Sequence, residues 1–147
     1  MDAGGFLRLN EVDVAHILVV EDNPVVRMLA EQHVESAGHT VMTAADGREA
    51  LLLAAAVRPD LILSDLDMPN LDGFGLIAAL RARADLAGVP VIFLTAFDDM
   101  ETFHRITQLG ADDFVNKPIN RTALLGAIDR CIALARQSTA SGSARPS

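Results

Sequence analysis

The chain has 147 residues, half of them hydrophobic, and carries a formal net charge of −8 at pH 7. This length suits one domain with a sizeable core, and the negative charge argues against nucleic acid or an anionic membrane surface as a primary partner. The single cysteine, Cys131, cannot form an internal disulfide, and no apolar run reaches the roughly 18 residues that span a bilayer. The first residues also lack a signal-peptide pattern, so the sequence predicts a cytoplasmic protein.

Short apolar runs alternate with longer segments of helical periodicity between the two ends of the chain. We expect a flexible leader over 1–14, a domain over 15–137 and a disordered tail over 138–147, where four of the ten residues are serine. The apolar runs predict strands near 16–20, 40–44, 61–64, 90–94 and 113–116.

Capping residues and glycines mark five helices between and after these strands. The expected helices run from Asn23-Pro24 to Gly38, from Asp46 toward Val57, from Asp72-Gly73 toward Ala84, from Asp98 or Asp99 to Gly110, and onward from Asn120. Strands that alternate with helices in this way are typical of a parallel sheet with right-handed crossovers. The sequence therefore predicts an α/β fold with a doubly wound, five-stranded parallel sheet.

Three carboxylates follow two of the predicted strands. Glu21 and Asp22 come after the first strand, and Asp65 comes after the third. If these strands are parallel neighbours, the three acids share one crevice at the carboxyl edge of the sheet. Like charges at such distances raise one another's pKa, and a hard cation such as Mg²⁺ relieves the repulsion. The acids therefore predict a magnesium site suited to phosphoryl chemistry.

Two donors end later strands at the same edge of the sheet. Thr95 follows the fourth apolar run and Lys117 follows the fifth. A hydroxyl and an ammonium are suitable donors to the outer oxygens of a phosphoryl group. In the flavodoxin-like strand order 2-1-3-4-5, the winding reverses between strands 1 and 3, and ligand crevices form there. The predicted phosphoryl site and the predicted ligand crevice therefore lie at the same place in the fold.

This ordered set of motifs resembles the receiver domains of two-component response regulators, over residues 16–136. The resemblance rests on Glu21-Asp22, on Asp65 with Asp-Met-Pro-Asn-Leu-Asp-Gly over 67–73, on Thr95-Ala96 and on Lys117-Pro118. Each motif alone is weak, whereas the set in this order is specific.

The resemblance implies that Asp65 accepts a phosphoryl group from a histidine kinase, a phosphotransfer protein or a small donor, with Mg²⁺ as cofactor. Asp22 and Asp65 would bind the metal directly, Asp67 through its main-chain carbonyl and Glu21 through water. Such a protein catalyses only its own phosphorylation and dephosphorylation. The side chain of Asp67 could repel the phosphoryl group or hold a hydrolytic water, and both effects stay open.

The resemblance also implies a switch. Thr95 and Lys117 would bind phosphoryl oxygens, the Lys117–Pro118 bond would be cis, and Phe114 would occupy the aromatic switch position. A downstream protein or a second copy would dock on the fourth helix, the strand 113–116 and the last helix. We expect Leu125 and Ile132 to point outward on that last helix.

Three alternatives differ in scope or class. The chain could be a stand-alone receiver, which we favour, or a fragment of a larger multidomain regulator. It could be a receiver fold that only binds proteins, although Asp22, Asp65, Thr95 and Lys117 are all present. It could also be a haloacid-dehalogenase-type phosphatase, because Asp65-Leu66-Asp67 is an Asp-x-Asp pair. That family places this pair after its first strand and its acidic pair near the end, which is the reverse of the order here.

Overall fold

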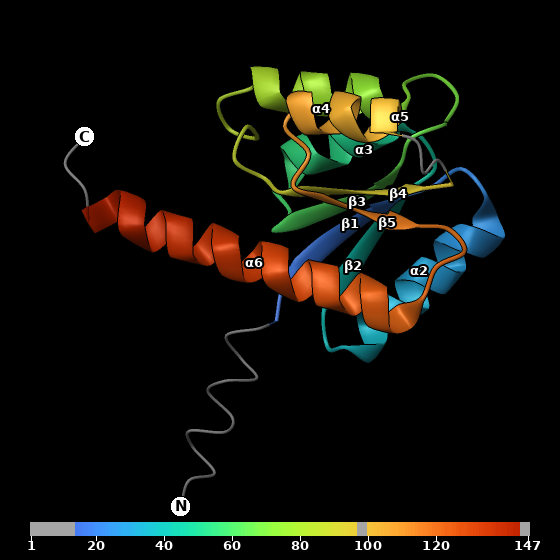
Figure 1. Cartoon of the computed structure of the whole chain (residues 1–147), viewed down its shortest axis with the longest axis horizontal. Helices are drawn as coiled ribbons and strands as arrows, with labels where there is room; N and C mark the ends of the chain where they lie inside the picture. The colour runs from blue at the N-terminus through green and yellow to red at the C-terminus, as the bar shows by residue number, and fades with distance from the viewer. Residues whose placement is uncertain (1–13, 97–99, 145–147) are drawn as a thin grey trace, which may run out of the picture.

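The computed structural model describes residues 14–96 and 100–144, which form a parallel sheet between two layers of helices (Figure 1). The strands are β1 (His16–Val20), β2 (Thr40–Ala44), β3 (Leu61–Asp65), β4 (Val91–Thr95) and β5 (Asp113–Asn116). The helices are α2 (Pro24–Ser36), α3 (Gly47–Ala56), α4 (Gly73–Ala82), α5 (Met100–Gln108) and α6 (Arg121–Ala144). The strand order β2-β1-β3-β4-β5, with every pair parallel, confirms the predicted flavodoxin-like doubly wound sheet.

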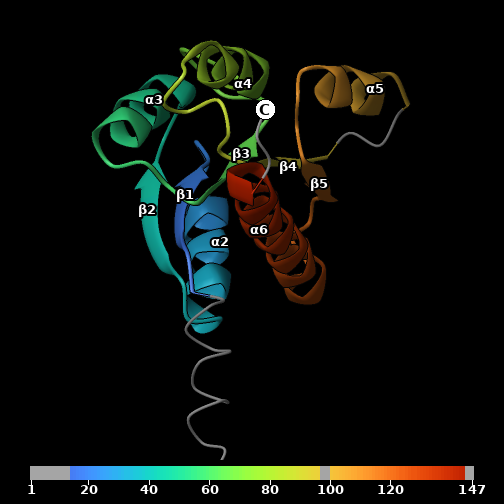
Figure 2. The same ribbon diagram turned by 90° about the vertical axis from the view of Figure 1, so that its left-hand side faces the viewer.

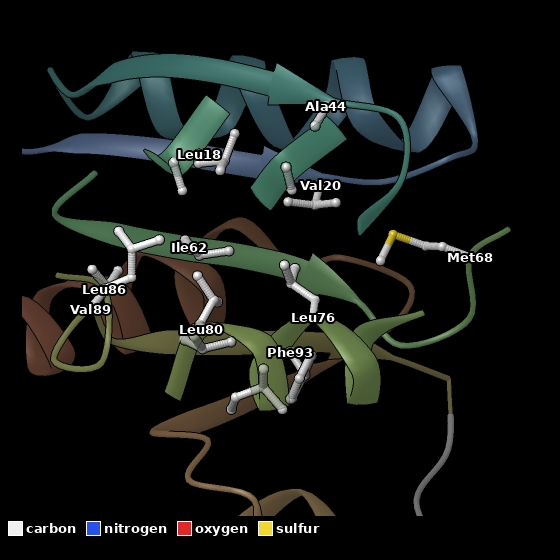
Figure 3. Close-up of a cluster of buried hydrophobic side chains, with 14 of the residues drawn as sticks. Leu18, Val20, Ala44, Ile62, Met68, Leu76, Leu80, Leu86, Val89 and Phe93 are labelled. Atoms are coloured by element: carbon white, nitrogen blue, oxygen red, sulfur yellow. The ribbon is translucent and has the colours of Figure 1, made fainter. Parts of the chain in front are cut away.

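Helices cover both faces of the sheet and bury its three central strands. Helices α2 and α6 lie on one face, and α3, α4 and α5 lie on the other (Figures 1 and 2). Side chains alternate along each strand, so Ile17 and Val19 of β1 pack in the α2–α6 core while Leu18 and Val20 pack in the opposite core. Figure 3 shows this second core, in which Phe93 is fully buried. Because the central strands are buried on both faces, their sequences are continuous apolar runs.

Helix boundaries follow the predicted capping residues. Asn23 Oδ1 accepts hydrogen bonds from the backbone N–H of Val25 and Val26 at the start of α2. The φ angles of Gly38 and Gly110 are +94° and +96°, just after α2 and α5. A residue without Cβ adopts this left-handed conformation without strain, which confirms both predicted helix ends.

The C-terminal helix differs from the sequence-based expectation in two ways. It continues through Ala144, seven residues into the predicted disordered tail. No proline lies between Pro118 and Pro146, so an existing helix extends by one hydrogen bond per added residue. In addition, Ile132 is only 5% exposed and Leu125 is half-buried, both against the α2–α6 core, whereas we expected them to point outward. The face of α6 that packs against the sheet thus includes residues that we expected to be exposed.

Two predicted features lie outside the described residues. These are the leader up to residue 13 and the start of the fourth helix at Asp98 or Asp99. Within 14–96 and 100–144, none of the helices is both long and apolar enough to cross a membrane.

Candidate functional site

Three carboxylates meet at the carboxyl edge of the sheet, where β1 and β3 lie side by side. The register pairs Val20 with Ser64, so Glu21 and Asp65 follow in neighbouring strands. Glu21, Asp22 and Asp65 each offer an oxygen, and these oxygens lie within 4.8 Å of one another. Asp22 is exposed while the other two are buried. The strand order therefore brings the predicted acidic cluster together.

Glu21 is the most deeply buried of these acids, with only 1% of its surface exposed. Burial raises the pKa of Glu21, because the charged carboxylate loses water, and the nearby charge of Asp65 acts in the same direction. Hydrogen bonds from the Lys117 side chain and the Asn23 backbone N–H oppose this rise. The balance leaves Glu21 easier to protonate than an exposed glutamate.

The ammonium of Lys117 lies between two of the carboxylates. Its Nζ is 2.9 Å from Glu21 Oε1 and 3.2 Å from Asp65 Oδ1. The lysine follows β5, and its backbone N–H donates to the carbonyl of Thr95 at 2.8 Å. The Lys117–Pro118 bond is cis. Burial lowers the pKa of Lys117, but the Glu21 hydrogen bond and the charges of Asp65 and Glu21 outweigh it and raise the pKa.

Thr95 and Phe114 lie on neighbouring strands in different surroundings. Thr95 is the last residue of β4 and is buried beside the ends of β3 and β5. Phe114 lies within β5, half-buried on the side of the sheet that α5 covers. Its ring meets the ring of Phe103 from α5 edge to face, with centroids 5.0 Å apart and planes at 64°. The ring contact of Phe114 therefore joins β5 to α5.

Asp67 belongs to the loop between β3 and α4. Its side chain is exposed, and it is not one of the three clustered carboxylates. The loop closes tightly, because Gly73 N–H donates to the Leu66 carbonyl at 2.9 Å. A Cβ on Gly73 would lie 2.6 Å from the Asp65 carbonyl oxygen, so only glycine lets α4 begin this close to Asp65.

The cluster has the donors that a hard divalent cation prefers. Carboxylate oxygens from three residues converge, and the single positive charge of Lys117 does not balance them. Mg²⁺ binds such oxygens through one or two carboxylates and retains several waters. The residues present therefore fit Mg²⁺, with exposed Asp22 giving access from solvent.

One contact in this cluster could not be predicted from the sequence. We expected Lys117 to bind a phosphoryl oxygen, and its ion pair with Glu21 was not foreseen. The two residues are far apart in the chain, and nothing in either local pattern links them. The only available signal is the need of a buried acid for a counter-charge.

Residues 17–129 match the family model of the response regulator receiver domain, and the chain belongs to this family. A probable transcriptional regulator ycf27 from Cyanophora paradoxa is 42% identical over 112 residues, which are 75% of this chain and 45% of that protein. The DNA-binding dual master transcriptional regulator RpaA of Synechocystis is 35% identical over 112 residues, 76% of this chain and 46% of that protein. The chain thus spans less than half the length of these curated relatives.

Solved structures of receivers share this fold. The chemotaxis protein CheY4 of Vibrio cholerae has a TM-score of 0.77 and 35% identity, covering 80% of this chain and 98% of its own. The receiver domain of a sensor histidine kinase from Pseudomonas aeruginosa, solved with magnesium coordinated in its active-site cleft, has a TM-score of 0.75 and 36% identity. That match covers 81% of this chain and 98% of the other.

Proposed function

We propose that this receiver takes up a phosphoryl group on Asp65 in a reaction that depends on Mg²⁺. The donor is a phosphohistidine on a histidine kinase or phosphotransfer protein, or a small phosphoryl compound. The observation that carries the proposal is the cluster of Glu21, Asp22 and Asp65 with the Lys117 ammonium in contact. The magnesium in the related Pseudomonas receiver supports the same choice of metal.

Each residue has a separate task in this reaction. One oxygen of Asp65 attacks phosphorus in line with the leaving group, so that an O–P bond forms as the donor's bond to phosphorus breaks. Asp22, the other Asp65 oxygen, the Asp67 carbonyl and, through water, Glu21 would hold Mg²⁺. The bound cation would neutralise the charge that gathers on the phosphoryl oxygens. Lys117 and Thr95 would donate to those oxygens.

Lys117 must change partners for this to occur. In the structure its ammonium is engaged by Glu21 and Asp65. A phosphoryl group on Asp65 adds about 1.5 to 2 negative charges, so it competes for the same ammonium. Movement of Lys117 and Thr95 toward the phosphoryl group would then couple the site to β5 and α5.

We propose that the signal leaves through the surface of α5, β5 and α6. Phe114 is the connecting residue, because its ring on β5 contacts Phe103 on α5. A downstream protein or a second copy of the chain would bind this surface when the rings rearrange. Since neither ring carries a hydroxyl, the change works through packing.

The donor protein needs a docking surface beside Asp65. Helix α2 begins directly after the acidic cluster, and its first turns expose the apolar side chains of Val25 (66%) and Met28 (52%). We propose that a histidine kinase or phosphotransfer protein covers these two side chains while its histidine reaches Asp65.

The length of the relatives favours a fragment of a larger regulator over a stand-alone receiver. Both named relatives are transcriptional regulators more than twice as long as the matched region. We therefore propose that the chain acts as the receiver part of a multidomain regulator, with the stand-alone receiver as the alternative. The net charge of −8 offers DNA little attraction, so nucleic-acid contacts would lie outside these residues.

Intact-mass spectrometry tests the phosphorylation. The native protein, incubated with acetyl phosphate and Mg²⁺, should gain the mass of one phosphoryl group, and chelation with EDTA should prevent the gain. Asp65→Asn should show no adduct, whereas Asp67→Asn, a matched change to an exposed neighbour, should retain it. Asp22→Ala should lose both the adduct and the response to Mg²⁺. An adduct that persists in Asp65→Asn would contradict the assignment.

A further inference from the structure

The loop after Asp65 contains an unusual backbone conformation. Asn70 has a φ angle of +69°, and it is the one residue other than glycine with positive φ among those described. The N–H of Leu71 donates to the carbonyl of Pro69 at 2.7 Å, which closes a three-residue turn around Asn70. A turn of this form, with positive φ at its centre, is the rare and strained type. Such a conformation persists where surrounding contacts hold it.

The start of α3 supplies those contacts. Asn70 Nδ2 donates a hydrogen bond of 2.7 Å to Asp46 Oδ2. The other oxygen of Asp46 accepts from the backbone N–H of Glu49 at 2.8 Å, so this aspartate caps α3 and binds the loop at once. Asparagine tolerates left-handed backbone better than most residues, but only its amide gives this bond to Asp46.

A second hydrogen bond joins the same two segments. The N–H of Gly47 donates to the carbonyl of Leu71 at 3.0 Å. A Cβ on Gly47 would lie 2.3 Å from that oxygen, so the helix end and the loop are packed as closely as backbone allows. The strained turn is therefore fixed on α3 by two consecutive loop residues.

The position of Asp67 depends on this fixed turn. The residue lies between Asp65, which ends β3, and the turn at Asn70. The hydrogen bond from the Gly73 N–H to the Leu66 carbonyl joins the two ends of the loop that contains it. With both ends of the segment held, the main chain at Asp67 has little freedom. A metal ligand on the main chain binds best when its orientation is set before the ion arrives.

We propose that Asp46 and Asn70 are positioning residues for the divalent-cation site. Their hydrogen bond holds the loop between β3 and α4, from which the main-chain carbonyl of Asp67 would bind the cation. This inference rests on the proposed function, since it concerns the same metal site. It assigns a role in metal affinity to two side chains that do not themselves touch the ion.

Metal binding, rather than activity, is the direct test. Mn²⁺ replaces Mg²⁺ as a paramagnetic probe, and its free concentration is read by electron paramagnetic resonance. Asn70→Gly removes the side-chain bond but accepts positive φ, and Asp46→Ser keeps a good helix cap but loses the second oxygen. Each variant should bind Mn²⁺ about tenfold more weakly, at the low end of the range for groups that orient metal ligands. The double variant should be no weaker than either single one, because both break one bond.

A matched control separates this role from the stability of α3. Glu49 Oε1 accepts from the Ala45 N–H at 2.7 Å, so Glu49→Ala removes a capping contact of the same helix without touching Asn70. It should leave Mn²⁺ affinity unchanged. Far-UV circular dichroism melts report the fold of each variant, since the chain has no tryptophan or tyrosine for fluorescence.

Phosphorylation kinetics give a second readout. In Asn70→Gly and Asp46→Ser, more Mg²⁺ should be needed for half-maximal phosphorylation by acetyl phosphate, while the rate at saturating Mg²⁺ should stay at the native value. Native-like Mn²⁺ affinity in both folded variants would overturn this inference alone. Failure of the native protein itself to bind Mn²⁺ would overturn the proposed metal site and the inference with it.

Discussion

Lys117 makes a shorter contact with Glu21 than with the proposed phosphoacceptor. Its Nζ lies 2.9 Å from Glu21 Oε1 and 3.2 Å from Asp65 Oδ1. Glu21 is almost fully buried, so its ionised form depends on this ammonium more than an exposed carboxylate would. The lysine therefore stabilises the acidic cluster before any phosphoryl group is present.

Removing this ammonium should destabilise the fold. Lys117→Met keeps most of the side-chain volume and leaves Glu21 and Asp65 facing each other without a counter-charge. Breaking a fully buried ion pair costs about 3–5 kcal/mol, and Lys117 is 23% exposed, so we expect a loss of about 2 kcal/mol at pH 7. Urea unfolding followed by circular dichroism measures this loss.

The loss in Lys117→Met should depend on pH. Burial raises the pKa of Glu21 above its ordinary value of 4.5, so Glu21 becomes neutral as the pH falls toward that value, and the need for an ammonium disappears. The destabilisation should be full at pH 7 and shrink near pH 4. Arg83→Met, which removes an exposed ion pair with Asp85, is the control and should lose much less stability, because solvent screens exposed charges. Equal losses in the two variants would contradict the role given to Lys117.

Cys131 should make stability fall at alkaline pH. Burial raises the pKa of its thiol from 9.0 to about 11, and the charges of Asp112 and Asp113 add to the rise. A raised pKa means that the folded state holds the proton more tightly than the unfolded state. The contribution of the protonated thiol to the free energy of unfolding is complete below pH 9.0 and is lost as the pH rises through about 11.

The matched variant is Cys131→Ala, which lacks the thiol. Between pH 8 and 11, the free energy of unfolding of the native protein should fall by about 2 kcal/mol more than that of the variant. Taking the difference between the two removes the effect of Lys117, whose pKa is also raised. If the free energies of unfolding of the two proteins change with pH in parallel, the thiol has the same pKa in the folded and unfolded states.

The sequence predicted the fold because its signals were local and mutually consistent. Apolar runs located the strands, and Asn23, Asp46 and Asp72 act as helix caps in the structure as their spacing predicted. Parallel strands place their carboxyl ends at one edge, so the meeting of Glu21, Asp22 and Asp65 followed from topology.

Features that depend on contacts between distant segments were not predicted. The bond between Asp46 and Asn70 joins two turns, and each residue had a complete local explanation without it. The same holds for Ile132, whose burial depends on how far α6 turns toward the sheet. A composition rich in serine also predicted disorder after residue 137, although a helix already formed continues there.

Helix α2 offers a test of donor docking that is independent of the chemistry. Met28→Glu places a charge on the exposed apolar patch with Val25. Transfer from a histidine kinase that phosphorylates the native protein should slow by about tenfold, equal to about 1.4 kcal/mol. Phosphorylation by acetyl phosphate should not change, because this small donor needs no docking surface.

The control for Met28→Glu is Leu52→Glu on α3. Leu52 is also apolar and is 70% exposed, but its helix covers the opposite face of the sheet (Figure 1). Leu52→Glu should slow neither transfer from the kinase nor phosphorylation by acetyl phosphate. If both variants slow transfer from the kinase equally, a general effect of added charge explains the result and α2 is not the docking helix.

The contact between Phe114 and Phe103 should carry the signal from the site to the surface of α5, β5 and α6. The two rings form a direct packing contact between β5 and α5, and Lys117 follows the last residue of the same short strand. If Thr95 moves toward the phosphoryl group, the space it leaves lets the Phe114 ring turn inward, and Phe103 loses its partner. Coupling of this kind is worth about 1–3 kcal/mol.

Phe114→Ala should therefore leave phosphorylation of Asp65 nearly intact and reduce the gain in dimerisation or partner affinity that phosphorylation produces. Sedimentation with and without beryllofluoride, which mimics the phosphoryl group, measures that gain. Phe74→Leu is the control, because the ring of Phe74 also contacts α5, through the Arg105 guanidinium at 3.7 Å, but belongs to α4. This control should retain the gain. An undiminished gain in Phe114→Ala would mean that the ring only fills the core, and that another route joins Asp65 to the surface.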